Sequence, residues 1–492
     1  MPKKTKSNSL VKFFELLLCV LPLVLFFSYY PVISFGSDST MNFEISLPIL
    51  WLLVFDFVGV FLLIKKKLVL NSLKKWRFLL FPLLISLSIL WSLNQTRGIL
   101  TCGVMWLVVI AVLLMVELRS VLSEGFSRKF LKWFFGSSLF VCAWCLVQCI
   151  LDVCGVARDY SLMCLGCTSY SFGFPHPNGF AIEPQFMGNL LLAPAIISGW
   201  LILRSRPRPA GPSPRAAGAN ARAAALRNAT SLKYYAILFF IFSATLFLTF
   251  SRGAIYAFAV AMIFMVTWMG VKQKSWKVLW TFAIMAGAFL FTLNLQGILS
   301  QVSPTNDTYQ SGVAKVLNHL SLGIIDIRQA QQTKKDETIS ESIVDKTQDE
   351  ENESAFDGYV AESTEIRKMM TRNAIKVWSR DFRTILFGVG IGGAGQAMYD
   401  AGLTGSPKEI VQNEYASLLL EVGLLGVIFA VVLLLKVVYI VTKSPANVAV
   451  LTLLVAYGIS LLFFAGLPNA LHIYLLPVSM CLFLDDKHLK EN

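Results

Sequence analysis

Side chains suited to chemistry gather at the two edges of one long hydrophilic segment, residues 296–412. Ser251-Arg252-Gly253 joins two apolar runs shortly before it, and Gln412-Asn413-Glu414-Tyr415 leads from it into another apolar run. A guanidinium group binds a phosphate through two parallel hydrogen bonds, and a carboxylate accepts the proton of an attacking hydroxyl group. These residues predict an active site beneath the hydrophilic segment, where Arg252 binds the anionic headgroup of a lipid.

The short turn places the Arg252 guanidinium where the membrane meets water. Charged groups at membrane depth are costly and usually face a cavity or a partner. The structural alternative is an arginine whose side chain extends to the interface and caps a helical hairpin. External loops of membrane proteins are poor in positive charge, which favours the functional interpretation.

Glu183 follows a proline- and glycine-rich stretch, residues 172–180, and directly precedes Pro184. Pro184 is expected in the first turn of an apolar helix. The sequence leaves two roles open for Glu183. Its charge either complements the helix N-terminus, or it serves as a general base or as an acceptor for a sugar hydroxyl.

A glycine-rich stretch, residues 387–395, contains a G-x-G-x-x-G match at Gly388, Gly390 and Gly393. A dinucleotide fold needs a flanking βαβ unit, which this segment lacks, and a cytoplasmic supply of the cofactor. We therefore interpret these glycines as places where the backbone approaches a sugar or a phosphate closely.

The end of the hydrophilic segment supplies further candidates. Asn413, Ser417 and Glu421 share one helical face through their i, i+4 spacing. Asn413 is also a helix-capping residue, and Glu421, about two turns into an apolar helix, is costly unless it is paired. His472, near the outer end of the last apolar run, lies at the same rim, although a single interfacial histidine is more often passive.

The elements that position these residues are apolar helices. The chain has 492 residues, 55% of them hydrophobic, and a mean hydropathy of +0.63, which excludes a soluble globular protein. About 20 apolar residues cross a bilayer as a helix. Twelve spans are predicted, at 11–34, 46–64, 78–93, 98–117, 130–153, 182–203, 234–250, 254–271, 278–295, 414–440, 446–465 and 468–485. The expected fold is an all-α polytopic membrane protein with a large extracytoplasmic loop before the last three spans.

The distribution of positive charge predicts the orientation. With a cytoplasmic N-terminus, the inner loops hold nearly all the lysines and arginines, whereas the short outer loops hold only Arg97, Arg158 and Arg252. Both termini are then cytoplasmic, and residues 296–412 are outside. The net charge of +13 follows from this topology and gives no support for nucleic-acid binding.

Four parts follow from these boundaries: a membrane domain with nine spans (1–295), the extracytoplasmic, periplasmic loop (296–412), the last three spans (413–492), and a basic cytoplasmic linker (204–231). The linker has four prolines and no acidic residue, so we expect disorder. Within the loop, the acidic stretch 331–357 is expected to be a tether. Residues 362–378 show helical apolar spacing and predict an amphipathic helix on the outer membrane surface that carries Arg367.

The nine cysteines divide by position. Six lie within spans and behave as small apolar residues. Cys154, Cys164 and Cys167 lie in an external loop, where an oxidising compartment permits a disulfide. Since C-x-x-C without a second pair is a weak metal or redox signal, we expect either one structural disulfide that uses Cys154 or no disulfide.

Taken together, these motifs resemble the O-antigen ligase and O-antigen polymerase superfamily of bacterial membrane glycosyltransferases. The turn Ser251-Arg252-Gly253-Ala254 is similar to the family's Ser-Arg-Gly turn. Residues 364–367, Trp378 and 388–392 resemble its Arg…Trp…Gly-x-Gly-x-Gly element. Asn413-x-Tyr415…Glu421-x-Gly423-Leu424-Leu425-Gly426 resembles its loop-end signature, and Phe180…Glu183-Pro184 resembles a motif of polymerase-like members. The likeness covers about residues 154–430.

The resemblance implies transfer or polymerisation of a polyprenyl-diphosphate-linked glycan outside the cytoplasm, onto a glycan or lipid acceptor, in cell-surface polysaccharide biosynthesis. It implies a bacterial inner-membrane enzyme without cofactor or metal and with inversion at the anomeric carbon. Arg252 and Arg367 would bind the diphosphate, and Glu183 or Glu414 would orient or deprotonate the acceptor hydroxyl. Asn413, Tyr415, Glu421 and His472 would bind substrate or support the site.

One departure from the family pattern bears on the chemistry. The loop-end histidine, the base in ligases of the family, is replaced by Gln412, and glutamine does not accept a proton at neutral pH. Either Glu414, Glu183 or His472 takes that role, or this chain is not such a ligase. The missing histidine and the Glu183-Pro184 pair favour a polymerase.

Two other classes remain open at this stage. A transporter or flippase for an amphiphilic lipid-linked substrate has a similar number of spans, but it should place polar residues at mid-membrane and show paired halves. A non-catalytic subunit of an envelope glycan complex would explain the absent base.

Overall fold

Apolar helices occupy every position at which a span is predicted. The structure, a computed structural model, describes residues 9–28, 31–35, 43–66, 79–156, 163–164, 166–169, 174–204, 219–273, 277–302, 308–321, 365–442, 448–466 and 470–484. Eight helices in this part of the chain are long and apolar enough to cross a membrane: α1 (Ser9–Phe26), α2 (Leu47–Lys65), α5 (Gln95–Leu118, continued by η3, Arg119–Val121), α6 (Phe126–Val153), α9 (Pro184–Arg204), α11 (Arg252–Gln273), α12 (Lys277–Val302) and α18 (Glu414–Thr442).

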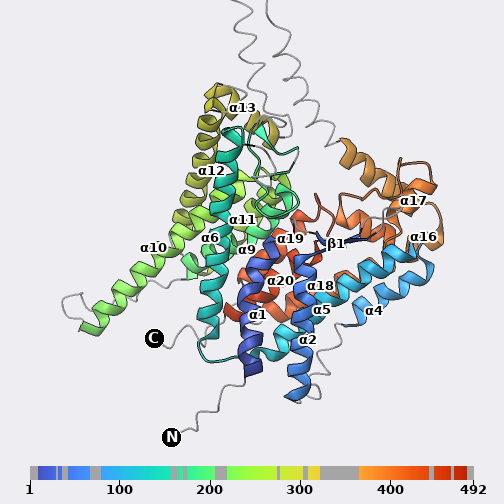
Figure 1. Ribbon diagram of the computed structural model, residues 1–492, viewed down its shortest axis with the longest axis horizontal. Helices are drawn as coiled ribbons and strands as arrows, with labels where there is room; N and C mark the ends of the chain where they lie inside the picture. Colours follow the sequence, from blue (N-terminus) through green and yellow to red (C-terminus); the bar gives the residue numbers. More distant parts are fainter. Residues whose placement is uncertain are drawn as a thin grey trace, which may run out of the picture.

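Shorter apolar helices fill the other predicted positions. They are α4 (Leu80–Leu87, continued by η2, Ser88–Trp91), the second part of α10 (Ala219–Leu248), α19 (Val448–Ser460) and α20 (Leu471–Met480, continued by η4, Cys481–Leu484). The prediction of an all-α polytopic membrane protein is confirmed (Figure 1).

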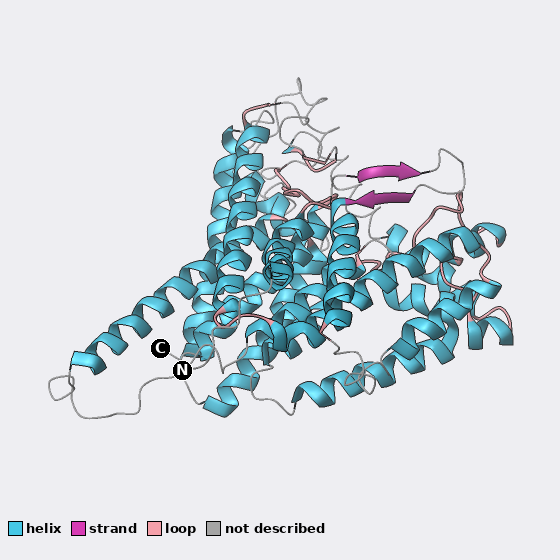
Figure 2. Ribbon diagram, turned by 60° about the horizontal axis from the view of Figure 1, so that its bottom comes forward, coloured by secondary structure: helices cyan, strands magenta, loops and turns pink. Residues whose placement is uncertain are grey.

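One small hairpin interrupts the helical pattern. β1 (Pro31–Phe35) and β2 (Phe43–Ser46) pair antiparallel (Figure 2). In this pairing Ile33 lies opposite Ile45. The predicted span 11–34 is therefore wrong at its end, because α1 ends at Phe26. Hydropathy alone does not separate helix from strand, whereas a proline followed by β-branched Val32 and Ile33 favours a strand.

α9 lies at the centre of the helix bundle. Its apolar window is entirely buried, and α10, α11, α19 and α20 pack around it. Asn189 in α9 ties two of these neighbours together, since it accepts a hydrogen bond from the Ser460 hydroxyl (2.6 Å) and donates one to the Tyr474 hydroxyl (3.2 Å). Buried polar pairs of this kind hold helices together in lipid, where apolar surface alone gives little preference.

The hydrophilic segment folds against one end of the bundle, which we call the loop side. α13 (Tyr309–Leu320) packs on α12, and Gly297 and Gly312 leave no room for a Cβ between the two helices. A helix at 365–378, α16 (Phe382–Phe387) and α17 (Ala394–Asp400) lie near the start of α18 (Figure 1). α12 continues to Val302, so the loop begins later than the predicted residue 296.

The predicted amphipathic helix exists but packs differently. Met370, Ala374 and Val377 are buried against residues of α17 and α18. Its apolar face thus covers protein rather than the membrane surface, although Ile366 and Met369 remain exposed.

The linker prediction needs a correction as well. α10 begins at Ala219, so the second half of the predicted linker 204–231 is helical. Its alanines and arginines are strong helix formers, which the low hydropathy of the stretch concealed. Residues 205–218 and the predicted tether 331–357 lie outside the described residues.

Candidate active site

Arg252 stands at a short turn on the loop side. α10 ends at Leu248, and α11 begins at Arg252 itself. Phe250, between them, has φ 45°, a left-handed conformation that is costly for a bulky residue and is typical of functional turns. Arg252 is only 9% exposed. The turn therefore holds a buried guanidinium at the end of two helices.

Two glycines allow neighbouring segments to close around this turn. A Cβ on Gly188 of α9 would lie 2.7 Å from the Cβ of Ala254, and one on Gly253 would lie 2.9 Å from the Cβ of Phe463. Both distances are shorter than side chains tolerate, so only glycine permits this approach. Hence α9 and the segment after α19 touch the turn directly.

Two buried histidines lie beside Arg252. The Nε2 atom of His319, from α13, is 3.1 Å from the Phe250 carbonyl oxygen, and the ring centroids of His319 and His176 are 6.1 Å apart. Because a carbonyl oxygen only accepts, Nε2 carries the proton. Burial lowers the pKa of His176 to about 3 and the pKa of His319 well below its usual value, and the charge of Arg252 acts in the same direction on both. Both rings are neutral at neutral pH, and Arg252 carries the charge.

Arg367 joins this region from the helix at 365–378. Its Nε donates a hydrogen bond to Oε1 of Gln412 (2.7 Å). Its charge acts on His319 and on Glu183. The structure thus places Gln412 in contact with Arg367, and it places His319 within range of both arginine charges and Glu183 within range of the Arg367 charge.

Glu183 lies directly before Pro184, the first residue of α9. Its side chain is exposed, yet the protein packed around it raises the pKa of its carboxyl through desolvation, while the charge of Arg367 lowers it. Since the Glu183 carboxylate is accessible and near a guanidinium, a substrate that binds the guanidinium could also reach the carboxylate.

Glu414 is held by the protein. It is 4% exposed, its backbone N–H donates to the Leu461 carbonyl (2.9 Å), and its carboxylate accepts a hydrogen bond from the Gly466 N–H. The same segment binds the start of α9, because Gln185 donates to the Phe463 carbonyl (3.0 Å). Glu414 therefore connects α18 to the segment that packs on the arginine turn.

Three other predicted residues have clear positions. Asn413 Oδ1 accepts from the Ala416 N–H (3.1 Å) and caps α18, and the Tyr415 hydroxyl donates to the Gly458 carbonyl (2.6 Å). His472 is 1% exposed, and neither ring nitrogen has a hydrogen-bond partner among the described residues. Asn413 and Tyr415 bond to backbone, and none of the three has a described bond to either arginine.

The glycine-rich stretch contacts α18 at a break in that helix. Gly423 has φ 67° and ψ −177°, which frees carbonyl groups of the preceding turn. The N–H groups of Val389 and Gly390 donate to the carbonyls of Leu420 and Glu421, both at 2.9 Å. Thus the expected close approach of these glycines exists, but it is to the protein's own backbone rather than to a sugar or a phosphate.

The Glu421 side chain completes this junction. Its carboxylate accepts hydrogen bonds from the N–H groups of Gly392 and Ala394, and the charge of Arg97 acts on it. On the other side of the glycine-rich stretch, the Ser92 hydroxyl donates to the Ile391 carbonyl (2.8 Å). Glu421 is accordingly paired, as its depth in an apolar helix requires.

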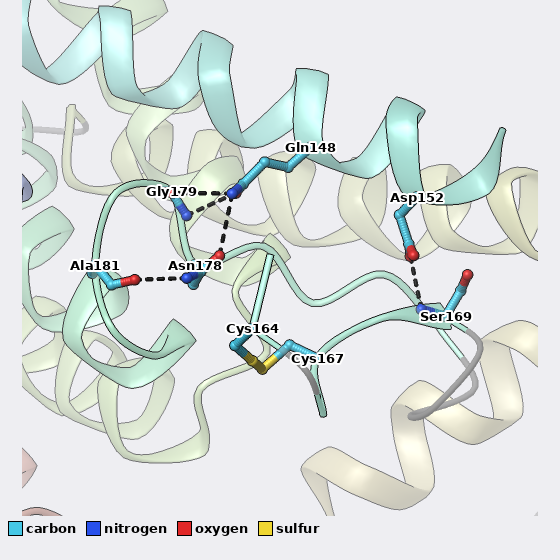
Figure 3. Close-up of a disulfide and its surroundings, with 8 residues drawn as sticks. All are labelled: Gln148, Asp152, Cys164, Cys167, Ser169, Asn178, Gly179 and Ala181. Atoms are coloured by element: carbon cyan, nitrogen blue, oxygen red, sulfur yellow. Dashed lines mark hydrogen bonds between the residues drawn. A yellow bond between two sulfur atoms is a disulfide. The ribbon is translucent and has the colours of Figure 1, made fainter. Parts of the chain in front are cut away.

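A disulfide joins Cys164 and Cys167, with Cα atoms 5.1 Å apart (Figure 3). The expectation of a bond through Cys154, or of none, is wrong, since Cys154 is free and exposed. The C-x-x-C spacing closes a turn, in which the Cys167 N–H donates to the Cys164 carbonyl (3.0 Å). The His176 N–H donates to the Cys167 carbonyl (3.0 Å), so the bonded turn helps to place His176.

His176 and His319 were not among the predicted site residues. The signal that could have found them is their rarity, since the chain has only four histidines. Among the described residues no group of three or more His, Cys, Asp or Glu side chains could hold a metal ion. The chemistry available at the loop side is anion binding by guanidinium groups and proton transfer to a carboxylate.

Comparison with known proteins gives one match. Residues 237–431 match the sequence family described as O-Antigen ligase (Wzy_C), a range that includes both arginines, Gln412, Glu414 and Glu421 but not Glu183. No curated protein and no solved structure gives a significant match to the chain. Over residues 237–431 this match confirms the resemblance to the O-antigen ligase and O-antigen polymerase superfamily.

Proposed function

We propose that this membrane protein transfers a glycan from a polyprenyl diphosphate to a hydroxyl group on the loop side. The family match implies transfer of lipid-linked glycans in general. The observation that carries the finer proposal is the placement of two guanidinium groups, Arg252 and Arg367, whose charges both act on His319. Two such groups match a diphosphate, which carries its negative charge on two adjacent phosphorus centres.

The reaction is a single displacement. The acceptor hydroxyl oxygen attacks the anomeric carbon, and the bond from that carbon to the diphosphate oxygen breaks. The bonding electrons leave with the polyprenyl diphosphate, whose charge Arg252 and Arg367 stabilise. The hydroxyl proton passes to a carboxylate, and the anomeric configuration inverts.

Glu183 is the carboxylate best placed to accept this proton. Its side chain is exposed and lies near Arg367, whereas Glu414 is buried and bonded to Gly466. The Gln412 side chain bonds to Arg367 and positions that guanidinium rather than removing a proton. We propose a polymerase, because the loop-end histidine is absent and Glu183 supplies the base from another part of the chain.

The proposed setting is the bacterial inner membrane, with both termini cytoplasmic and the loop side facing the periplasm. The positive charge of the predicted inner loops supports this orientation. The donor would then reach the arginines from the outer leaflet, and the acceptor would be a glycan or a lipid.

Substitution of the arginines tests the proposal. In cells that lack the endogenous protein, Arg252→Ala or Arg367→Ala should abolish glycan transfer, measured as glycan chain length, while the protein still accumulates in the membrane. Arg252→Lys should recover little, because one ammonium group does not reproduce the two parallel hydrogen bonds. Gln412→Ala should cost less than either.

The matched control is Arg372→Ala, on the same helix as Arg367 but exposed. It should leave chain length unchanged. Normal transfer by Arg252→Ala would rule out the diphosphate-binding mechanism, and an inactive Gln412→Ala beside it would move the site to the end of the loop.

A further inference from the structure

A polar pocket lies on the loop side, between the start of α5 and the start of α18. Its lining includes Arg97, Thr101, Glu409, Ser417 and Glu421. The water-accessible space is about 10 Å³, which is the room of a single hydroxyl-sized group. Glu409 at its rim is exposed. Arg97 is also one of only three positive charges in the predicted short outer loops, and the proposed transfer reaction does not use it.

Thr101 gives independent evidence that the pocket takes a ligand. Hydroxyl groups in buried helices usually donate to the carbonyl four residues earlier, as Thr292 does to Ala288 (2.9 Å) and Thr452 to Val448 (2.7 Å). Thr101 is 2% exposed, and its Oγ1 has no hydrogen-bond partner among the described residues. A buried hydroxyl without a partner destabilises the protein, so a group that enters the pocket and bonds to it removes that cost.

The pocket offers complementary groups for one hydroxyl. The carboxylate of Glu409 accepts hydrogen bonds, the Arg97 guanidinium donates them, and the hydroxyls of Thr101 and Ser417 do both. A sugar hydroxyl or hydroxymethyl group both donates and accepts, and it has the size of the space. A phosphate would be repelled by the two carboxylates of Glu409 and Glu421.

One stretch of chain links the pocket to the proposed transfer site. Val411 lines it, and the next residue, Gln412, holds Arg367. We propose that this pocket binds an exocyclic hydroxyl or hydroxymethyl group of a sugar ring in the glycan substrate, with Thr101 as the residue that recognises it. The proposal rests on the proposed glycan transfer and adds a sugar-recognition subsite to it.

Thr101→Val provides the test, because valine has the shape of threonine without its hydroxyl. The unpartnered hydroxyl contributes nothing to folding, so the variant's melting temperature without ligand should equal or exceed that of the wild type. The purified full-length protein in detergent is titrated with two probes, and its melting temperature is followed. One probe is a set of short oligosaccharides released by mild acid from the source strain's surface polysaccharide, and the other is inorganic pyrophosphate.

The wild type should be stabilised by both probes. Thr101→Val should need about tenfold more oligosaccharide for the same shift, which is the loss of one buried hydrogen bond, and should respond normally to pyrophosphate. Arg252→Ala should lose the pyrophosphate response and keep the oligosaccharide response. Thr452→Val, whose hydroxyl bonds its own helix, should respond to both probes like the wild type.

Two results would overturn the subsite. An unchanged oligosaccharide response in Thr101→Val would mean that the pocket holds an ordered water only, and a wild type that oligosaccharide does not stabilise would mean that no sugar binds. A wild type that responds to oligosaccharide but not to pyrophosphate would count against the diphosphate site while leaving the subsite in place.

Discussion

At the scale of single residues, different groups of the proposed site bind the anion and accept the proton. Burial keeps His176 and His319 neutral beside Arg252, so neither ring competes with the guanidinium for an anion. Glu183 is a carboxylate that remains accessible within range of the Arg367 charge. The arginines would stabilise the leaving diphosphate, and Glu183 would take the proton.

The pH dependence of transfer tests the role of Glu183. Desolvation raises the pKa of this carboxyl, so its proton-accepting form disappears at a higher pH than an ordinary glutamate would allow. Transfer should therefore fall on the acid side as pH drops through this raised pKa. Glu183→Gln should reduce transfer by at least about a hundredfold at every pH. If Glu183→Gln kept both the rate and the acid limb, the base would lie elsewhere.

Charged residues at membrane depth can be recognised in a sequence, because removing their charge from water is costly and such residues are therefore rare. Arg252, Glu183 and Glu421 could be singled out in this way. His319 could not, since it reaches Phe250 only because α13 folds back over α12. Pairing is equally hidden: nothing local indicates that Glu421 bonds to Gly392 and Ala394 or that Gln412 bonds to Arg367.

At the scale of elements, the junction between the glycine-rich stretch and α18 fixes the loop to the membrane helices. The break at Gly423 exposes carbonyl groups, and the stretch satisfies them as a neighbouring strand would. The same stretch bonds Ser88 and Ser92 at the end of α4 and η2. From hydropathy we predicted α18 as one span, because a single glycine within an apolar run does not indicate a break in the helix.

Gly388→Ala tests this junction. Gly388 has φ 71°, and a Cβ there would collide with the Glu421 carbonyl. With ψ −172° it lies in a backbone region that is essentially restricted to glycine and costs an alanine about 1–3 kcal/mol, and the collision adds to it. The variant should melt several degrees below the wild type in detergent. Gly405→Ala is the control, because a Cβ at Gly405 meets nothing within 4 Å and its φ is not left-handed. Equal melting temperatures of the two variants would contradict the conclusion that this junction stabilises the protein.

At the scale of the whole molecule, segments far apart in the chain meet on one side of the bundle of apolar helices. α13, the helix at 365–378 and the segment after α19 contribute to the surroundings of the arginine turn. The length and composition of the spans were predictable because a bilayer demands about 20 apolar residues. The packing of the spans against one another could not be predicted, since the lipid-facing and protein-facing sides of a helix are similarly apolar. In α12, for example, apolar residues are spread almost evenly around the helix.

The orientation of this arrangement is the last prediction, and every proposal above depends on it. If the loop side faces outward, a cysteine at Ser342→Cys should react with a membrane-impermeant thiol reagent in intact cells, and one at Ser213→Cys should react only after the cells are opened. The background for both is Cys154→Ala, because Cys154 is the exposed free cysteine among the described residues. Wild-type Cys154 serves as an internal check, since it ends α6 on the predicted outer side and should also be labelled from outside.

Labelling of Ser213→Cys in intact cells, with Ser342→Cys protected, would show that the protein has the opposite orientation in the membrane. Arg252 and Arg367 would then face the cytoplasm, where the positive-inside rule would explain their charge without any role in binding a diphosphate.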